Sequence, residues 1–519
     1  MDKIKNGTVL VWLRNDLRIL DNEALTKGIK FSEDKKYKIV PIVCFDPRHY
    51  EKSMVGHIRK TQNLRAKFLI ESVDDLRKNL NRIGGNLMIK VGRPEDVIKN
   101  IIEDLNVKKV FAHKEVGSEE TTVENGVSKV VDLDLLWSHT LVHPDDLPKG
   151  TTPMTIPMTF ASFRNRILKD LKVRDPIPEP KDLKDITPEL SEQEWGTVPS
   201  LTDLGFDSNK IEPEKRAVMK FTGGETEGIK RTKAYIWNKS QPLSDYANTR
   251  NGLIGADYSS KFSPWMSVGC ISPRYIYQQV KLYEKKYKSN DGIEALIREL
   301  FFRDYFRYLG QKVGNKIFKI SGIRNYNGKD EPTWDTDPEK LKRWCEGRTG
   351  HPMVDANIRE MNLSGWMSNR GRMITSSFFS RDMGMDWRLG AEYFEAKLID
   401  YDVTSNWCNW MYIAGVGNDP RGGSRSFNMI KQAKDFDPKG EYIKSWIPEL
   451  KNVPIPKLPV PWLLTASERK QYGCEDYPEP VVEVPLPASM KPKKKAEPGA
   501  KKRKATTNIA LSPKKAKKE

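Results

Sequence analysis

The sequence has no long hydrophobic run. No stretch of about 18 apolar residues, the length that a membrane-spanning helix needs, is free of charge. Its first residues, MDKIKNGTVL, lead directly into an apolar, strand-like run and lack both the apolar segment of a signal peptide and the Arg-rich pattern of a transit peptide. These absences predict a protein without a membrane span and without a secretory or organellar leader.

Cysteine is also scarce, with five residues spread among 519 and no CxxC pair. A disulfide framework is therefore excluded, because it needs many cysteines in a short secreted chain. The six histidines are isolated, so neither residue type has the ligand spacing of a metal site. We expect a reduced, intracellular protein without a metal centre.

Apolar runs alternate with helical patterns in the first part of the chain. The runs at 8–13 and 38–45 predict buried strands, and apolar positions over 64–83 recur every three or four residues, as one face of a long helix requires. Further strands are expected near 87–91, 108–112 and 130–134. This alternation predicts an α/β, Rossmann-like domain with a doubly wound parallel sheet over residues 6–140.

The edge of this sheet lacks a dinucleotide motif. The first strand continues as WLRNDLRILDN without GxGxxG, which argues against a nicotinamide-dependent dehydrogenase. Glu115 follows the fourth strand, at the carboxyl end where such sheets bind ligands. It is either a ligand contact or an ordinary carboxylate at a helix start, which the helix dipole favours.

The rest of the chain divides into three parts. Residues 141–225 are rich in proline, serine and charge and predict a long interdomain linker with short helical pieces such as 160–172. Residues 226–450 show no alternating strand pattern and predict an all-α domain. Its helices are expected at 228–237, 272–287, 292–310, 338–345, 352–363, 373–382 and 389–398.

Positive charge is concentrated at the end of the chain. Of the net charge of +18, residues 491–519 carry +10 and the rest about +8. Residues 451–519 are Pro-rich and then Lys-rich, which predicts a disordered extension. Three clusters in it resemble nuclear-import signals and predict an import receptor and a nuclear location, otherwise a cytoplasmic one: KPKKK (491–495), KKRK (501–504) and PKKAKK (513–518). The alternative is a basic tail that adds non-specific affinity for nucleic acid.

Residues 365–412 combine many aromatic and many charged side chains. Four tryptophans and four arginines surround Asp400, Asp402 and Asn406. A protein core rarely mixes these kinds, because each buried polar atom needs a hydrogen-bond partner. The mixture predicts a pocket for a large, flat, polar cofactor.

A group of hydroxyls, Ser259, Ser260 and Ser263, lies next to Arg250 and Lys261. Such a turn can bind a phosphate through hydroxyls, backbone amides and the positive end of a helix, without a lysine. Helix capping is the alternative for any single serine. The group as a whole favours an anion site.

Glu299 and Arg303 are four residues apart in the helix expected at 292–310, so they lie on one face. A surface ion pair is the usual reason for such a spacing. The aromatic residues around them favour partial burial and a functional role instead. The residues alone leave both interpretations open.

A series of long motifs runs through both halves of the chain: WLRNDLR with DNEAL (12–25), TRNGLIGADYSSKFSPW (249–265), GCISPR (269–274), RDYFR (303–307), GWMSNRGR (365–372) and DWRLGAEYFEAKLIDYDVTSNWCNW (386–410). With them, residues 8–450 resemble the photolyase/cryptochrome family. NRGR followed by GVGNDPR (415–421) is similar to the cryptochrome DASH branch of that family.

The resemblance implies FAD buried in the helical domain. It implies that Arg372 pairs with Asp400 beside the isoalloxazine ring, that Asp402 binds the ring edge and that Asn406 faces flavin N5. A neutral asparagine there, with an arginine nearby, favours the anionic reduced flavin. The residues implied to hold the phosphates are Tyr246, Ser259, Ser260, Ser263 and Arg303.

Three tryptophans, Trp410, Trp387 and Trp334, align with the family's electron-transfer triad, which leads from the flavin to the surface. Each alone is better explained as a core aromatic, because tryptophan is ordinarily buried for its area. Together, at matching positions, they predict a photoreduction chain. Trp407 has no assigned role and is interpreted as packing.

In the family's photolyases for cyclobutane pyrimidine dimers, reduced flavin donates an electron to a flipped-out dimer. Phe302 and Tyr412 stand where two tryptophans usually sandwich the dimer, and they stack with less area, so single-stranded DNA is the preferred substrate. Ser368 and Asn369 stand where (6-4) photolyases need histidine, which argues against that activity. The residues implied to surround the dimer are Glu299, Asn369, Arg370 and Met373.

The sequence thus predicts a monomeric, blue-light-driven deoxyribodipyrimidine photo-lyase with FAD as cofactor and DNA as partner. The alternative is a blue-light signalling photoreceptor that uses the same flavin. DASH members generally bind methenyltetrahydrofolate as an antenna pigment, and Glu115 is the position assigned to it.

Overall fold

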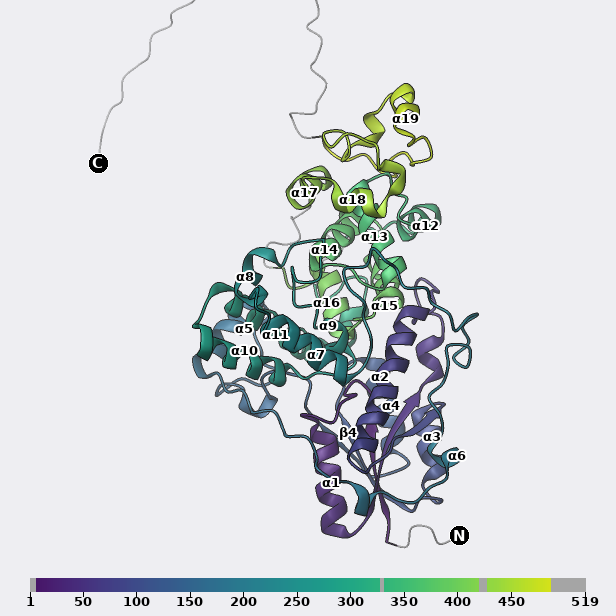
Figure 1. Ribbon diagram of the computed structural model, residues 1–519, viewed down its shortest axis with the longest axis vertical. Coiled ribbons are helices and arrows are strands. Elements are labelled where there is room, and N and C mark those ends of the chain that lie inside the picture. The colour runs from purple at the N-terminus through teal and green to yellow at the C-terminus, as the bar shows by residue number, and fades with distance from the viewer. Residues whose placement is uncertain (1–5, 327–330, 420–426, 487–519) are drawn as a thin grey trace, which may run out of the picture. The chain divides into compact units, whose positions relative to one another are not determined.

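The computed structural model describes residues 6–326, 331–419 and 427–486. Residues up to Val484 pack as one compact unit, with a parallel sheet toward the N-terminus and a helical half after it (Figure 1). The disorder predicted for the basic tail, and its three clusters, lie outside the described residues.

Five parallel strands form the sheet, in the order β3-β2-β1-β4-β5. The side chains of β1 alternate between two cores: Val9, Val11 and Leu13 enter a large core that continues into the helical half, whereas Leu10 and Trp12 enter a smaller one. Both faces of the sheet are therefore covered, and the predicted α/β fold is confirmed. The strands are β1 (Thr8–Leu13), β2 (Lys38–Phe45), β3 (Met88–Val91), β4 (Val107–His113) and β5 (Leu133–Leu136).

Four helices accompany the sheet, and α1 packs against β1 and β4. They are α1 (Glu23–Lys35), α2 (Asn63–Arg82), α3 (Pro94–Ile101) and α4 (Ser118–Ser128). The last strand lies about three residues later than the predicted 130–134. The amides of Val130 and Val131 both donate to the Val127 carbonyl (3.0 and 3.2 Å), so the end of α4 takes up residues that had been expected in the strand.

The segment between the two halves is held at several points. Its helices are α5 (Phe160–Ile167) and α6 (Glu192–Trp195). At its start, the buried Asp304 carboxylate accepts hydrogen bonds from the amides of Leu141 and Val142, both at 2.9 Å. The segment therefore packs on the helical half as well as on the sheet domain.

The second half contains helices and no named strand in its described part, which confirms the predicted all-α class. Its helices are α7 (Glu225–Ile236), α8 (Pro242–Thr249), α9 (Ser263–Ser267), α10 (Pro273–Tyr287), α11 (Asp291–Val313), α12 (Pro338–Cys345), α13 (Pro352–Ser364), α14 (Asn369–Ser377), α15 (Trp387–Lys397), α16 (Val403–Ala414), α17 (Met429–Phe436) and α18 (Glu441–Trp446). Helix α16 was not predicted, because its tryptophans and polar residues show no clear apolar stripe.

The C-terminal extension was predicted to be disordered from residue 451, and for residues 451–484 this is wrong. Leu458 and Tyr477 are each 1% exposed, and the segment includes α19 (Ala466–Tyr472). The Tyr477 hydroxyl donates to Asp355 at 2.6 Å, and the Val481 amide donates to the Thr349 carbonyl at 2.8 Å. These apolar and polar contacts anchor a proline-rich segment that lacks helical periodicity.

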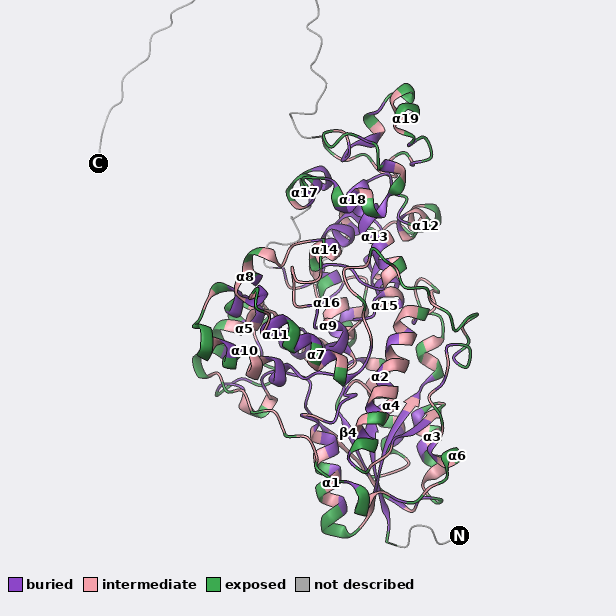
Figure 2. Cartoon of the chain, viewed as in Figure 1, coloured by how far each residue is buried: buried purple, intermediate pink, exposed green. Residues whose placement is uncertain are grey.

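Burial follows this arrangement. The strands and much of α11 and α13 are buried, whereas the outer turns of α1 and of α19 are exposed (Figure 2). Within the described part of the chain, no helix combines the length and the apolar character needed to cross a membrane.

Candidate active site

A cavity of about 310 Å³ opens among the helices of the second half. Helices α8, α11, α14 and α16 contribute to its wall, together with the serine-rich turn before α9. Most residues singled out in the sequence line it: Tyr246, Ser259, Ser260, Ser263, Glu299, Phe302, Arg303, Asn369, Arg372, Met373, Asp400, Asp402, Asn406 and Trp410.

One wall is built on a buried ion pair. Arg372 Nη2 donates to both carboxylate oxygens of Asp400, at 2.9 and 2.8 Å, so the expected pairing is present. Ser263 Oγ also donates to Asp400 Oδ2, at 2.7 Å. This hydroxyl therefore orients the carboxylate, and its predicted role on a phosphate stays a prediction. The three side chains form a fixed polar wall beside Trp366, whose ring lies 5.5 Å from the Arg372 guanidinium.

A second polar group stands at the start of α16. Asp402 caps this helix, with its side chain accepting from the Ser405 amide at 2.8 Å. Burial favours a raised pKa for Asp402, but the charges of Arg303 and Arg307 outweigh burial and hold the pKa below its usual value. An anion is therefore kept at this side of the cavity.

One turn later, the Asn406 amide nitrogen donates to the Ala391 carbonyl at 3.0 Å. This bond orients the side chain, so the amide oxygen remains the group that is available on the cavity side. Asn406 can thus accept a hydrogen bond from an N–H group at the edge of a ligand, and its amide does not titrate.

Lys261 was missed in the sequence as a site residue. It lines the cavity, is 2% exposed and has a left-handed backbone (φ 54°). Its ammonium donates to the Ala256 carbonyl at 2.8 Å and lies 3.4 Å from the ring centroid of Tyr258, and none of the ion pairs found in the described segments includes it. Burial lowers the pKa of Lys261 to about 6. A buried lysine without a carboxylate partner, beside a cavity, fits an anionic ligand.

Glu299 does not pair with Arg303, so the surface ion pair considered from their spacing is wrong. Its carboxylate instead forms an ion pair with Arg250 at the cavity wall. Arg303 instead donates to the carbonyls of His139, after β5, and of Met266 on α9. The Glu299 side chain is 32% exposed and lines the cavity, where a polar ligand edge can reach it.

Two predicted substrate residues do not line the cavity. Arg370 donates to Asn251 Oδ1 at 2.9 Å, and its guanidinium lies 4.4 Å from the ring centroid of Phe436. Tyr412 is on α16, two residues beyond Trp410, and is likewise absent from the lining. Neither side chain is part of the lining, because helix periodicity turns both away from the face that carries Asn369 and Trp410.

The three tryptophans are arranged on neighbouring elements. Trp410 lines the cavity and packs so tightly on α15 that a Cβ at Gly390 would lie 2.2 Å from its Cη2. Trp387 begins α15 and is fully buried. The segment that carries the half-buried Trp334 joins the start of this helix, because the Asp335 amide donates to the Gly384 carbonyl at 2.8 Å. Trp410 and Trp387 are thus buried, and Trp334 is partly exposed.

A second cavity, of about 150 Å³, lies at the carboxyl ends of the strands. The sheet order changes direction between β1 and β4, and Asn15 and Glu115 follow these two strands, at the place where doubly wound sheets bind ligands. Glu115 accepts from Asn15 Nδ2 at 3.0 Å and from Arg307 at 2.7 Å. Arg303 and Asp402 line both cavities, so the two share a wall.

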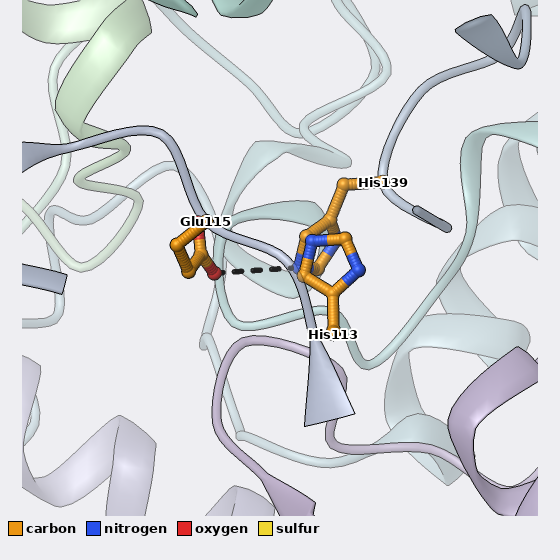
Figure 3. A group of neighbouring side chains, drawn as sticks. All are labelled: His113, Glu115 and His139. Atoms are coloured by element: carbon orange, nitrogen blue, oxygen red, sulfur yellow. Dashed lines mark ion pairs between the residues drawn. The ribbon is translucent and has the colours of Figure 1, made fainter. Parts of the chain in front are cut away.

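Glu115 also belongs to a group of metal-ligand type that the sequence had not indicated. His113, Glu115 and His139 bring their ligand atoms within 4.8 Å of one another (Figure 3). Arg307 already faces this group and donates to Glu115 and to His113 Nε2 (3.0 Å). Burial lowers the pKa of His139 to about 3, while Arg307 keeps the pKa of Glu115 well below its usual range. A guanidinium thus provides the positive charge that a metal ion would bring.

Two family models match this architecture. Residues 9–181 match the DNA photolyase model, and residues 296–490 match the FAD binding domain of DNA photolyase. The cryptochrome DASH of Gloeobacter violaceus is 46% identical over 92% of this chain and 93% of its own. The Arabidopsis thaliana protein named cryptochrome DASH, chloroplastic/mitochondrial, is 43% identical over 87% of this chain and 77% of its own. A crystal structure of a Synechocystis cryptochrome superposes with a TM-score of 0.85 at 43% identity, covering 92% of this chain and 96% of that one.

Proposed function

The chain belongs to the cryptochrome DASH branch of the photolyase/cryptochrome family and has its FAD-binding domain, and on this premise we propose that it repairs cyclobutane pyrimidine dimers in blue light. The preferred substrate is a dimer in single-stranded DNA. The observation that carries the proposal is that the Arg372–Asp400 pair, Asn406 and Trp410 line the same cavity as Glu299 and Asn369. Reduced FAD, when bound, supplies the electron that splits the dimer.

The chain's own groups divide into three sets around this cofactor. Lys261 brings a buried positive charge to the end where the phosphates would lie, and Arg372 with Asp400 provides a rigid polar wall for the ring. Asp402 and Asn406 offer an anion and a fixed amide to its edge. The remaining residues that would hold the phosphates are Tyr246, Ser259, Ser260, Ser263 and Arg303.

Glu299 and Asn369 would orient the dimer. The Arg250 guanidinium holds the Glu299 carboxylate in the cavity lining, where it can accept hydrogen bonds from a base edge. Phe302 and Met373 offer apolar faces for stacking. Since extraction of a dimer from a duplex costs a few kcal/mol, and phenylalanine stacks with less area than tryptophan, single strands are the easier substrate.

The flavin would be reduced by electron transfer through Trp410, Trp387 and Trp334, in that order from the cavity outward. The cavity-lining position of Trp410 and the partial exposure of Trp334 support this direction. Glu115 and the second cavity would hold a folate antenna, methenyltetrahydrofolate. The site at the carboxyl ends of the strands supports a planar pigment, with Asn15 and Arg307 fixing the Glu115 carboxylate.

The location we assign is the nucleus, on the basic clusters of residues 491–518, which an import receptor would read. The named location of the Arabidopsis relative makes chloroplasts and mitochondria the alternatives to check. A fluorescent fusion of the full chain, compared with one ending at residue 490, tests this assignment. Loss of nuclear signal in the shorter fusion is the expected result.

A repair assay tests the function. The reduced, FAD-loaded protein is illuminated with dimer-containing oligo(dT), single-stranded or in a duplex, alongside Glu299→Ala. We expect dimer loss that is faster in the single strand and strongly reduced in the variant. Absence of dimer loss in both substrates, with intact light-driven flavin reduction, would instead support a blue-light signalling photoreceptor.

A further inference from the structure

Trp407 connects the tryptophan chain to a tyrosine. It is buried on α16, and its ring meets that of Trp387 edge-on, with centroids 5.7 Å apart and an interplanar angle of 79°. On its other side, Trp407 Nε1 donates a hydrogen bond to the Tyr401 hydroxyl at 3.2 Å. Trp387, Trp407 and Tyr401 are thus three oxidisable side chains in consecutive contact. This series diverges at Trp387 from the predicted path to Trp334.

The proton of the Tyr401 phenol has a nearby acceptor in the Glu395 carboxyl group. Its oxygen accepts from Trp407, and Glu395 lines the second cavity together with Tyr401 and interacts with the phenol electrostatically. Burial raises the pKa of Glu395 to about 7, so near neutral pH the carboxyl group can take up a proton.

The surroundings disfavour a positive charge on the tyrosine ring. The Arg65 guanidinium lies 4.5 Å from the ring centroid of Tyr401, and its Nη1 donates to the Glu395 carbonyl at 2.9 Å. A cationic radical beside a fixed cation is repelled. Oxidation of Tyr401 is therefore coupled to loss of its proton, and the product is a neutral radical.

We propose that Tyr401 is a second terminal electron donor of the protein, reached from Trp387 through Trp407, with Glu395 as the acceptor of its proton. The inference rests on the proposed light-driven electron transfer through Trp410 and Trp387, which supplies the oxidant.

The steps balance as follows. The Trp387 radical cation takes one electron from Trp407, and the Trp407 radical cation then takes one electron from Tyr401. The O–H bond of Tyr401 breaks, and its proton goes to the Glu395 carboxylate. The net change is one-electron reduction of oxidised Trp387, one-electron oxidation of Tyr401 and protonation of Glu395.

The branch differs from the path to Trp334 in which side chain is finally oxidised. One path ends at the half-buried Trp334, and the other ends at Tyr401, which lines both cavities. A neutral tyrosyl radical is reduced back slowly, because a proton must return together with the electron. The branch would thus prolong charge separation without an external donor.

Tyr393 provides a matched control. It is a buried tyrosine on α15, and its ring meets Trp344, which in turn contacts Trp410 with ring centroids 6.3 Å apart. Its hydroxyl, however, bonds to the Cys345 carbonyl and to Asn362, so no carboxylate takes its proton. Tyr393 should therefore remain unoxidised.

The test is light-induced electron paramagnetic resonance and transient absorption of the FAD-loaded protein, with ring-deuterated tyrosine to identify a tyrosyl signal. We expect the signal in the wild type and in Tyr393→Phe, its loss in Tyr401→Phe, and a severalfold decrease in Glu395→Gln. FAD content and thermal unfolding of each variant report whether it folds. A tyrosyl signal that persists in Tyr401→Phe, or its absence from the wild type, would overturn the proposal.

A second comparison separates this inference from the proposed function. Trp334→Phe should retain part of the light-driven reduction, and Trp334→Phe with Tyr401→Phe should lose it. Equal reduction in the single and double variants contradicts the branch and leaves the main chain intact. Loss of photoreduction in Trp387→Phe together with normal repair by chemically reduced protein supports the shared first steps. Absence of photoreduction in the wild type overturns the branch, and repair by the chemically reduced protein then still decides the proposed function.

Discussion

Replacement of Lys261 by methionine should have opposite effects on the FAD-free and the FAD-bound protein. The lysine is buried beside the main cavity, where the Ala256 carbonyl and the Tyr258 ring are its neighbours. Without an anion in the cavity, its charge is poorly compensated. A phosphate of the cofactor would provide the missing negative charge, so the same residue destabilises one state and stabilises the other.

The magnitude follows from the pKa of the ammonium group. Lysine titrates near 10.4 in an unfolded chain, and burial lowers the pKa of Lys261 to about 6. With about 1.4 kcal/mol per pH unit, Lys261 should lower the free energy of unfolding of the FAD-free protein by roughly 5 kcal/mol at pH 7. Because the unfolded state binds the additional proton between pH 6 and 10, this stability should rise with pH across that window.

Methionine has a similar length and no charge, so it removes both the cost and the pH slope. In the FAD-bound protein, a hydrogen bond from a charged donor is lost, worth about 1.5–3 kcal/mol. At pH 5, where Lys261 is charged with and without FAD, FAD affinity should therefore fall by roughly 10- to 150-fold. The same free energy raises the pKa of Lys261 by about 1–2 units, so the wild type should take up roughly half a proton or more on binding FAD near pH 7, and Lys261→Met should not.

Three measurements check this: urea unfolding of the FAD-free protein from pH 6 to 9, fluorescence titration with FAD, and calorimetry in two buffers of different ionisation enthalpy. Lys230→Met is the matched control, because Lys230 is an exposed lysine that pairs with Glu227. The reasoning is refuted if Lys261→Met destabilises the FAD-free protein, or if it binds FAD with the affinity and proton uptake of the wild type.

Three further changes have defined outcomes. Trp387→Phe should abolish light-driven flavin reduction, measured by absorption, and unchanged kinetics would contradict the chain. Gly390→Ala places a Cβ 2.2 Å from Trp410 Cη2, so it should displace the indole and slow the same reaction, with a fall in thermal stability as a second readout. Tyr477→Phe removes the hydrogen bond to Asp355 (2.6 Å) and should lower the free energy of unfolding by about 1.5–3 kcal/mol; no change would mean that the extension does not stabilise the fold.

The fold could be read from the sequence because its signals are local. Strands buried on both faces appear as continuous apolar runs such as 8–13, and a long amphipathic helix repeats every three or four residues. Errors occur where local signals are weak. Helix α16 carries tryptophans and polar residues on several faces, and residues 451–484 are held by tertiary contacts of Tyr477 and Leu458 that no periodicity announces.

Much of the site could also be anticipated, since its residues lie in long motifs. The pairing of these side chains could not be anticipated, because it depends on distances between segments far apart in the chain. Glu299 meets Arg250 instead of Arg303, and Arg370 bonds to Asn251 outside the cavity wall. His113, Glu115 and His139 converge although 24 residues separate the second from the third. Lys261 was visible only as a neighbour of three serines, and its burial is a tertiary property.

The shared wall between the two cavities has a consequence for how they act together. Arg303 and Asp402 face both cavities, and the charge of Arg303 helps to hold Asp402 as an anion. Arg307 adds to this field and is itself bound by Glu115. A ligand that binds Glu115 in the second cavity therefore changes the electrostatic potential at Asp402 in the first. The link is the Arg307–Glu115 hydrogen bond of 2.7 Å, and charges in this buried environment are weakly screened. Glu115→Gln should accordingly shift the redox behaviour of FAD even in the absence of an antenna pigment, which a redox titration of pigment-free protein would detect. An unchanged titration would mean that the two cavities are electrostatically independent.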